Sequence, residues 1–119
     1  MPEDSSRILL VEDEGLVCML LEDLLADMGC DIVGPAVNID EAEALASREA
    51  FDFALLDVNL GSQNSFSVAD ILSRRGIPYA FLTGYGVEGV RKDLRAAPVL
   101  LKPIDVPRLE QMLEAFDLI

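Results

Sequence analysis

The fold of this chain is decided by the stretch Phe53-Ala54-Leu55-Leu56-Asp57-Val58-Asn59. Its four apolar residues in a row predict a β-strand that is buried on both faces, as in a parallel sheet. The run ends in a carboxylate, Asp57, and an amide, Asn59, follows two residues later. A buried parallel strand presents its last side chain at the carboxyl edge of the sheet, where open α/β sheets bind their ligands. We therefore expect a site at the end of this strand.

Composition limits the class of protein. The 119 residues suit one domain, and 51% of them are hydrophobic, which is enough for a substantial core. The formal net charge is −13, so we expect no binding to nucleic acid or to anionic membranes, because both need a positive surface. No apolar run reaches the roughly 20 residues of a membrane span, and the N-terminus lacks a signal-peptide pattern. A cytoplasmic protein is expected.

The chemistry available to the chain is narrow. It has two cysteines, Cys18 and Cys30, and no histidine. Metal sites built on imidazole, Ser-His-Asp catalysis and an internal phosphohistidine are therefore excluded. The two cysteines are expected to be buried thiols rather than a disulfide or a metal site.

Four further apolar runs predict strands, and each strand is followed by a helical pattern. The strands are expected at 7–11, 31–34, 79–83 and 99–101, and the helices at 15–28, 40–48, 66–75, 87–95 and 105–116. Asp40 is the candidate N-cap of the second helix, and Gly89 makes the short fourth helix the least rigid element. Short connections between parallel strands force right-handed crossovers. We predict an α/β domain over residues 7–119, a doubly wound (βα)5 sandwich, after an N-terminal tail of residues 1–6.

Reactive side chains from distant parts of the chain should meet at the carboxyl edge of this sheet. The first strand delivers Glu12 and Asp13, the third Asp57, the fourth Thr83 and the fifth Lys102. Each of these residues alone has an ordinary interpretation, as a helix cap, a turn residue or a surface charge. Their combination along one edge favours a functional site.

Three carboxylates so close together repel one another, which raises their pKa values unless a cation joins them. The single ammonium of Lys102 cannot balance three negative charges, whereas Mg²⁺ binds oxygen ligands and leaves room for water and phosphate. Asp57 would keep an oxygen free to form an acyl phosphate. Mg²⁺ and Lys102 would neutralise the phosphoryl oxygens, to which Thr83 would donate a hydrogen bond. The edge therefore predicts Mg²⁺-dependent phosphoryl transfer.

Four motifs occur in a specific order and spacing: Leu-Val-Glu-Asp-Glu (10–14), Leu-Leu-Asp-Val-Asn-Leu (55–60), Thr83-Gly84 and Lys102-Pro103. With them the chain resembles the receiver domain of two-component response regulators, over about residues 7–116. The resemblance implies a flavodoxin-like fold with a parallel five-stranded sheet of order 2-1-3-4-5. It also implies that the phosphoryl group comes from a sensor histidine kinase or a histidine phosphotransfer protein.

The resemblance gives the acidic residues their expected roles. Asp57 would be the phosphoacceptor. Glu12 and Asp13 would bind Mg²⁺ together with Asp57 and the backbone carbonyl of Asn59. These ligands would hold the cofactor beside the reacting carboxylate.

The resemblance also implies a group that binds the phosphoryl oxygens. Thr83 and Gly84 would contact the phosphoryl group and move with it, and Lys102 would pair with one of its oxygens. Pro103 would shape the following loop, in many receivers through a cis peptide bond.

Three positions depart from the usual receiver pattern. Glu12 stands where aspartate is commoner, and Gly84 stands where many receivers have alanine. Strand five usually carries Tyr or Phe three residues before the lysine, and here that place is Val99. The stretch Phe-Leu-Thr-Gly-Tyr (81–85) is similar to a motif of small single-domain receivers, the group nicknamed FAT GUY, which also lack this aromatic residue. We hypothesise that Tyr85 takes over the switching role, which makes Tyr85 and Val99 the switch candidates.

Signal output is expected to use protein contacts. No output domain is expected, so a downstream protein partner would receive the signal, and the chain would be a monomer or a weak homodimer. Six successive apolar residues, 16–21, circle the first helix completely, so some of them must face outward. Val17 and Leu20 of this helix, with Ile104 after the lysine loop, are the candidate docking residues for a partner.

Other functions remain open at this stage. A haloacid-dehalogenase-like phosphatase also places an aspartate after a buried strand, but it needs a second aspartate where this chain has Asn59. A degenerate receiver acting as a scaffold is opposed by Thr83 and Lys102 and favoured by Val99. A nucleotide-binding module is disfavoured, because no Gly-rich loop follows the first strand. The main prediction is a phosphoaccepting signalling domain, not a classical enzyme.

Overall fold

The computed structural model describes residues 5–119 and is built around a five-stranded parallel sheet. The central strand is β3 (Phe53–Asp57), and the order across the sheet is β2-β1-β3-β6-β7. The other strands are β1 (Arg7–Val11), β2 (Asp31–Ala36), β6 (Tyr79–Thr83) and β7 (Val99–Leu101). This order corresponds to the predicted 2-1-3-4-5, and the doubly wound α/β fold is confirmed. Residues 1–4 of the predicted tail lie outside the described residues.

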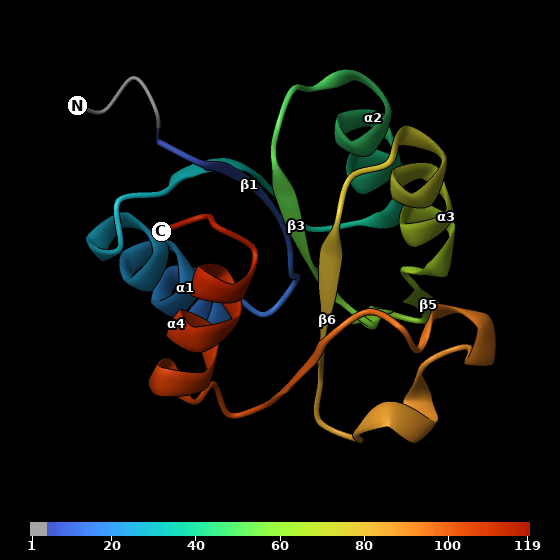
Figure 1. Ribbon diagram of the computed structural model, residues 1–119. Helices are drawn as coiled ribbons and strands as arrows, with labels where there is room; N and C mark the ends of the chain where they lie inside the picture. Colours follow the sequence, from blue (N-terminus) through green and yellow to red (C-terminus); the bar gives the residue numbers. More distant parts are fainter. Residues whose placement is uncertain (1–4) are drawn as a thin grey trace.

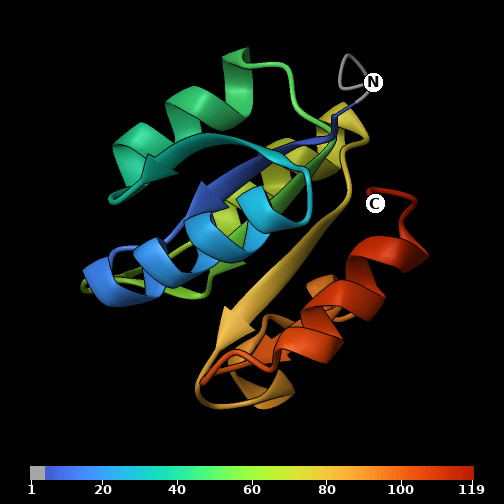
Figure 2. The ribbon, with the colours of Figure 1, turned by 90° about the vertical axis from the view of Figure 1, so that its left-hand side faces the viewer.

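Helices cover both faces of the sheet (Figure 1). They are α1 (Gly15–Asp27), α2 (Ile39–Arg48), α3 (Phe66–Arg75) and α4 (Val106–Ala115). Side chains of α1 and α4 share one apolar cluster, and side chains of α2 and α3 share the cluster on the opposite face. Figure 2 looks onto the face that carries α1 and α4. Among residues 5–119, no helix has the length and apolar character needed to cross a membrane.

All five residues of β3 are buried. Because strand side chains alternate between faces, Phe53 and Leu55 join the cluster under α1 and α4, whereas Ala54 and Leu56 join the cluster under α2 and α3. The prediction of a strand buried on both faces is confirmed. Asp57 is its last residue, so the strand brings this carboxylate to the carboxyl edge of the sheet.

The second helix begins earlier than predicted. Its N-cap is Asn38, whose side-chain oxygen accepts a hydrogen bond from the Glu41 amide at 2.9 Å. In return, the Glu41 carboxylate accepts one from the Val37 amide at 2.9 Å. These reciprocal bonds satisfy amides that would otherwise lack partners at the start of the helix. The prediction of Asp40 as the N-cap is therefore wrong, since Asp40 lies inside the first turn.

The predicted helix at 87–95 is also wrong. The segment between β6 and β7 forms two short 3₁₀ turns, η2 (Val87–Gly89) and η3 (Lys92–Leu94). Gly86, at φ 79°, and Gly89 disfavour a continuous α-helix because glycine loses the most conformational entropy there. Arg91 instead ties the segment to α3 through hydrogen bonds to the Asp70 carboxylate.

The second strand runs further than predicted, to Ala36, through a cis Gly34–Pro35 bond. Gly34 has φ 99°, and a Cβ at this position would lie 2.8 Å from the Ala36 amide nitrogen, so a larger residue does not fit. The carbonyl of Ala36 accepts a hydrogen bond from the Glu12 amide at 3.0 Å. The end of β2 thereby fixes the backbone of the first predicted site residue.

Truncation of the central strand should destabilise the fold strongly. We expect Leu55→Ala to reduce the free energy of unfolding by about 2–5 kcal/mol, because Leu55 is fully buried and its removal leaves a cavity. Leu16→Ala is the matched control: Leu16 is 83% exposed, so its truncation should change stability by only about 0.5 kcal/mol. Urea unfolding followed by circular dichroism measures both changes. Equal effects of the two substitutions would contradict the assigned core.

Candidate functional site

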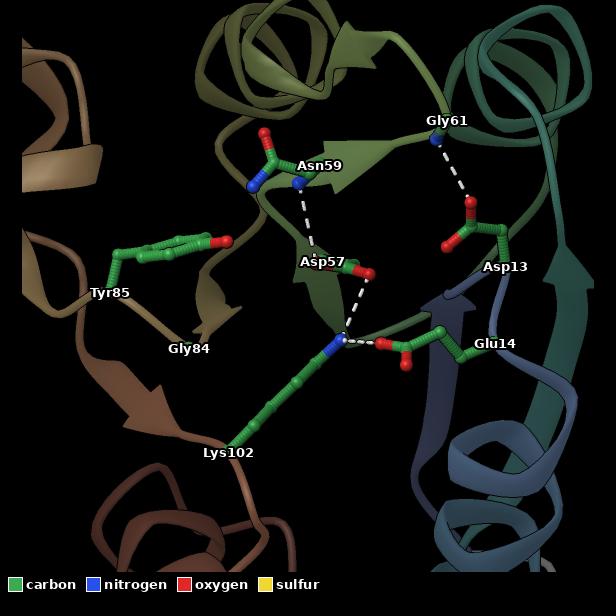
Figure 3. Close-up of a pocket in the computed structure, with 8 residues that line it drawn as sticks. All are labelled: Asp13, Glu14, Asp57, Asn59, Gly61, Gly84, Tyr85 and Lys102. Carbon is green, nitrogen blue, oxygen red and sulfur yellow. Dashed lines mark hydrogen bonds and ion pairs between the residues drawn. The ribbon is translucent and has the colours of Figure 1, made fainter.

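A hollow of about 440 Å³ opens at the carboxyl edge of the sheet (Figure 3). Its lining residues come from the ends of several strands and from the loops that follow them: Asp13, Glu14, Asp57, Asn59, Gly61, Gly84, Tyr85 and Lys102. The structure therefore brings Asp13, Asp57 and Lys102 together at this edge. Glu12 and Thr83, which are both buried, are not among the residues that line the hollow.

Three carboxylates gather in this hollow or directly beside it. Glu12, Asp13 and Asp57 each offer an oxygen, and these oxygens all lie within 4.8 Å of one another. Glu12 and Asp57 are buried and Asp13 is exposed, so the cluster reaches from the protein interior to the solvent. Clustered carboxylate oxygens are the donor set that hard divalent cations such as Mg²⁺ prefer.

Lys102, at the end of β7, joins this cluster through its ammonium group. Its Nζ atom lies 3.0 Å from Asp57 Oδ2 and 3.0 Å from Glu12 Oε1. A third carboxylate, Glu14, approaches closer still, with 2.7 Å between its Oε1 and the same Nζ. Burial opposes the charged form of Lys102, but its hydrogen bonds to Glu14, Asp57 and Glu12 outweigh burial and raise the pKa of the ammonium.

Glu12 lies in an environment that disfavours a free negative charge. Burial, together with the neighbouring Asp57 carboxylate, raises the pKa of Glu12 from 4.5 to about 7, against the opposing hydrogen bonds from the Glu14 amide and Lys102. Its Oε1 has no hydrogen-bond partner, although the Lys102 ammonium lies nearby. A buried, unsatisfied carboxylate oxygen beside two further carboxylates fits a bound divalent cation.

A small hairpin that the sequence did not reveal holds two of the acids in place. It consists of β4 (Asn59–Leu60) and β5 (Gln63–Asn64). At its turn, the Gly61 amide donates to Asp13 Oδ2 at 2.9 Å, and at its start the Asn59 amide donates to Asp57 Oδ1 at 3.2 Å (Figure 3). The loop after β3 thus orients carboxylates from two different strands.

The end of β6 links the pocket to the following segment. The Thr83 hydroxyl accepts a hydrogen bond from the Tyr85 amide at 3.0 Å. Tyr85 is 78% exposed, and Figure 3 shows its ring beside Gly84 with the hydroxyl directed toward the side of the pocket that carries Asn59. A Cβ at Gly89 would lie 3.9 Å from Thr83 Oγ1 and 3.8 Å from Tyr85 Cβ, so the η2 turn packs against both residues.

The remaining residues predicted for the site lie around β7. The Lys102–Pro103 bond is cis, as the resemblance implied. Val99 pairs with Phe81 of β6 and is partly buried against the cluster under α2 and α3, away from the acidic hollow. Ile104 is partly buried against the opposite cluster, under α4.

The outward face of α1 differs in part from the prediction. Leu20 is exposed as expected, but Val17 is partly buried against the cluster under α1 and α4, so its assignment to the outward face is wrong. Leu16 and Met19 are the more exposed apolar residues. The helical wheel required outward residues in this run, but only the packing against β1 and α4 selects which ones they are.

The residue that sequence reasoning missed is Glu14. It lines the hollow and makes the shortest contact to Lys102. The available signal was the run of three acids, Glu12-Asp13-Glu14, of which the resemblance gave a metal-binding role only to the first two. The contact joins residues 88 positions apart in the chain, so only the fold reveals it.

Comparisons with known proteins show the family to which this chain belongs. The family model of the response regulator receiver domain matches residues 8–114. The chain is 34% identical to the transcriptional regulatory protein PdtaR of Mycobacterium tuberculosis over 113 residues, which are 91% of this chain and 55% of PdtaR. The chain therefore spans about half the length of this curated relative.

Solved structures of other proteins have the same fold as this chain. The solution structure of SdrG from Sphingomonas melonis Fr1 has a TM-score of 0.83 and 38% identity, with 95% of this chain and 97% of SdrG covered. The BeF3-activated conformation of SdrG has a TM-score of 0.78, with 95% and 96% covered at the same identity. The receiver domain of the sensor histidine kinase PA1611 from Pseudomonas aeruginosa PAO1 has a TM-score of 0.81 and 25% identity, with 94% and 97% covered. Its structure has a magnesium ion coordinated in the active site cleft.

This chain belongs to the response regulator receiver domain family of two-component signalling. The family is a class of phosphoaccepting signalling domains rather than classical enzymes, and its members bind Mg²⁺ at an acidic pocket. The cluster of Glu12, Asp13 and Asp57 has the composition of such a pocket.

The stability of the metal-free protein should fall as the pH rises from about 4.5 to about 7. The pKa of Glu12 in the folded state lies above its ordinary value of 4.5, so the stability from its neutral form is complete below pH 4.5 and is lost as the pH rises through 7. The slope should approach about 1.4 kcal/mol per pH unit at most. Urea unfolding in EDTA at several pH values measures it. Glu12→Gln should flatten the curve in this window, and an unchanged slope in this variant would refute the assignment to Glu12.

Proposed function

We propose that this chain accepts a phosphoryl group onto Asp57 from the phosphohistidine of a sensor histidine kinase or a histidine phosphotransfer protein, in the cytoplasm. A downstream protein would then recognise the phosphorylated form. The observation that carries the proposal is the Lys102 ammonium, 3.0 Å from Asp57 Oδ2 at the wall of an acidic hollow. A carboxylate, a cation and a cluster of metal-ligand oxygens within one pocket are the groups that phosphoryl transfer to an aspartate requires.

The metal ligands in this proposal are Glu12, Asp13, Asp57 and the backbone carbonyl of Asn59. The fit of the three carboxylates rests on the 4.8 Å cluster of their oxygens and on the unsatisfied Oε1 of Glu12, whereas the Asn59 carbonyl is taken from the resemblance. The magnesium ion in the PA1611 receiver supports the choice of Mg²⁺. When bound, the ion would neutralise negative charge on the phosphoryl oxygens and on the acids. The hydrogen bond from Gly61 would keep Asp13 oriented toward it.

Asp57 would act as the nucleophile. One of its carboxylate oxygens would attack the phosphorus atom of the donor and form a new O–P bond, while the P–N bond of the phosphohistidine breaks. The imidazole nitrogen would keep the electron pair of that bond, and the ring would leave as neutral imidazole when its other nitrogen carries a proton. Asp57 is buried at the end of β3, and the Asn59 amide and Lys102 each contact one of its oxygens, so its orientation would favour one line of attack.

Lys102 and Thr83 would bind the new phosphoryl group. Lys102 would turn its ammonium from the free carboxylates to a phosphoryl oxygen, which carries more negative charge. The Thr83 hydroxyl would donate to another oxygen, beside the Gly84 backbone. Because this hydroxyl accepts a hydrogen bond from the Tyr85 amide, its reorientation would be transmitted to Tyr85 and to the η2 turn. The BeF3-activated conformation of SdrG shows that a relative of this chain has a distinct activated state.

Tyr85 is our candidate for the moving residue of the switch. It would replace the aromatic residue that receivers usually have at the position of Val99. It is exposed, sits beside three glycines at 84, 86 and 89, and contacts Thr83 through its backbone. Partner binding would use the exposed apolar residues of α1, Leu16, Met19 and Leu20, which begin directly after the acidic loop. A kinase bound to these residues of α1 would lie close to Asp57.

Phosphorylation by a small-molecule donor tests this function directly. Incubation with Mg²⁺ and acetyl phosphate or phosphoramidate should add one phosphoryl group, which intact mass spectrometry detects as an acid-stable and alkali-labile adduct. The adduct should be absent without Mg²⁺, because the carboxylates then repel the anionic donor. It should also be absent in Asp57→Asn, which lacks the nucleophile.

Asp40→Asn is the matched control, because Asp40 is exposed on α2 and away from the hollow. This variant should be phosphorylated as the unchanged chain is. A folded protein that gains no adduct would refute the proposal and favour a scaffold role. Continuous turnover of phosphate monoesters would favour a phosphatase.

A further inference from the structure

We propose that Glu14 is a positioning residue that holds Lys102 in the unphosphorylated protein and competes with the phosphoryl group for it. The inference rests on the proposed function of Asp57. Glu14 would thereby favour the metal-bound, unphosphorylated state and oppose the phosphorylated one.

The contact between Glu14 and Lys102 is the first observation. At 2.7 Å, Glu14 Oε1 is the nearest of the three carboxylates to Lys102 Nζ, and the close-up shows the lysine extended between Glu14 and Asp57 (Figure 3). The Glu14 side chain is 60% exposed and the Lys102 side chain 17%. Glu14 is therefore an exposed anion at the rim of the hollow, and its carboxylate contacts a mostly buried cation.

The position of Glu14 on the backbone is the second observation. It is the N-cap residue of α1, yet its side chain makes no capping hydrogen bond. Only its carbonyl serves the helix, by accepting from the Cys18 amide at 2.9 Å. The carboxylate thus forgoes the favourable contact with helix amides that an N-cap position offers. Its one hydrogen bond among the described residues joins it to Lys102.

Competition follows from the number of donors on the lysine. An ammonium has three N–H groups, and here three carboxylates surround it, Glu12, Glu14 and Asp57. When Glu12 and Asp57 turn their oxygens to a cation, Glu14 still offers the lysine a partner, so charge repulsion between lysine and cation is relieved. A phosphoryl group on Asp57 adds a stronger anion to the acceptors around the lysine, so the ammonium is drawn away from Glu14, and the Glu14 charge also repels the phosphoryl oxygens.

Glu14→Gln tests this competition, and the two binding steps should respond in opposite directions. In a titration followed by ¹H–¹⁵N spectra, the Mg²⁺ affinity should weaken several-fold. At saturating Mg²⁺, the affinity for beryllofluoride, which mimics a phosphoryl group, should strengthen several-fold. Glu110→Gln is the matched control: it removes the same charge from an exposed residue of α4 that lines none of the hollow, and it should change both affinities less than twofold.

A double-mutant cycle separates a contact through Lys102 from a simple charge effect at the rim. In a Lys102→Ala background, Glu14→Gln should weaken the Mg²⁺ affinity much less than it does in the unchanged chain, because no lysine remains to be held. An equal weakening in both backgrounds would overturn the inference. Urea unfolding should give Glu14→Gln nearly the same free energy of unfolding as the unchanged chain, because the substitution removes no helix-capping hydrogen bond.

The two proposals fail in distinguishable ways. If the unchanged chain binds no beryllofluoride in the presence of Mg²⁺, the function proposed for Asp57 fails. If the unchanged chain binds it and Glu14→Gln binds it equally well, the role of Glu14 alone fails.

Discussion

The ammonium of Lys102 holds together a group of carboxylates that would otherwise repel one another. Glu12 and Asp57 are buried, and two such charges without a nearby cation would be costly in the protein interior. The lysine is itself largely buried and charged because these acids surround it. The arrangement of the acidic site therefore depends on one shared cation. In the proposed reaction, the Lys102 ammonium would turn from the carboxylate oxygens to the oxygens of the phosphoryl group on Asp57.

The sheet makes this arrangement possible because it brings together residues that are far apart in sequence. From β1 the chain turns to β2 on one side, and it then returns to β3 on the other side. This reversal opens a crevice at the carboxyl edge, where Asp13 and Asp57 lie. On the far side, β6 and β7 add Thr83 and Lys102, and the backbone bond from the Lys102 amide to the Thr83 carbonyl, 2.9 Å, keeps those two strand ends together.

Much of the fold and of the site was predictable, because apolar runs in the sequence predict buried strands whose ends carry the site residues. The strand that ends in Asp57 is apolar and buried throughout, so its end marks the site. Features that depend on tertiary contacts were not predictable. The two errors about helices had local causes instead: hydrogen bonds among Val37, Asn38 and Glu41 make Asn38 the helix cap in place of Asp40, and glycines keep the segment after Tyr85 from forming an α-helix. No pattern in the sequence indicates a partner for Glu14, because its contact with Lys102 depends on where the fold places the residue after β7.

The position of Lys102 Nζ in the complex with Mg²⁺ and beryllofluoride tests the central claim most directly. A crystal structure of that complex should show beryllofluoride on Asp57, with the ammonium in contact with a fluorine atom. Nζ should have moved away from Glu14, and the Thr83 hydroxyl should have left the Tyr85 amide. A structure with beryllofluoride on Asp57 and the ammonium still bound by Glu14, Glu12 and Asp57 would contradict the account. So would a folded protein in which beryllofluoride binds at another residue.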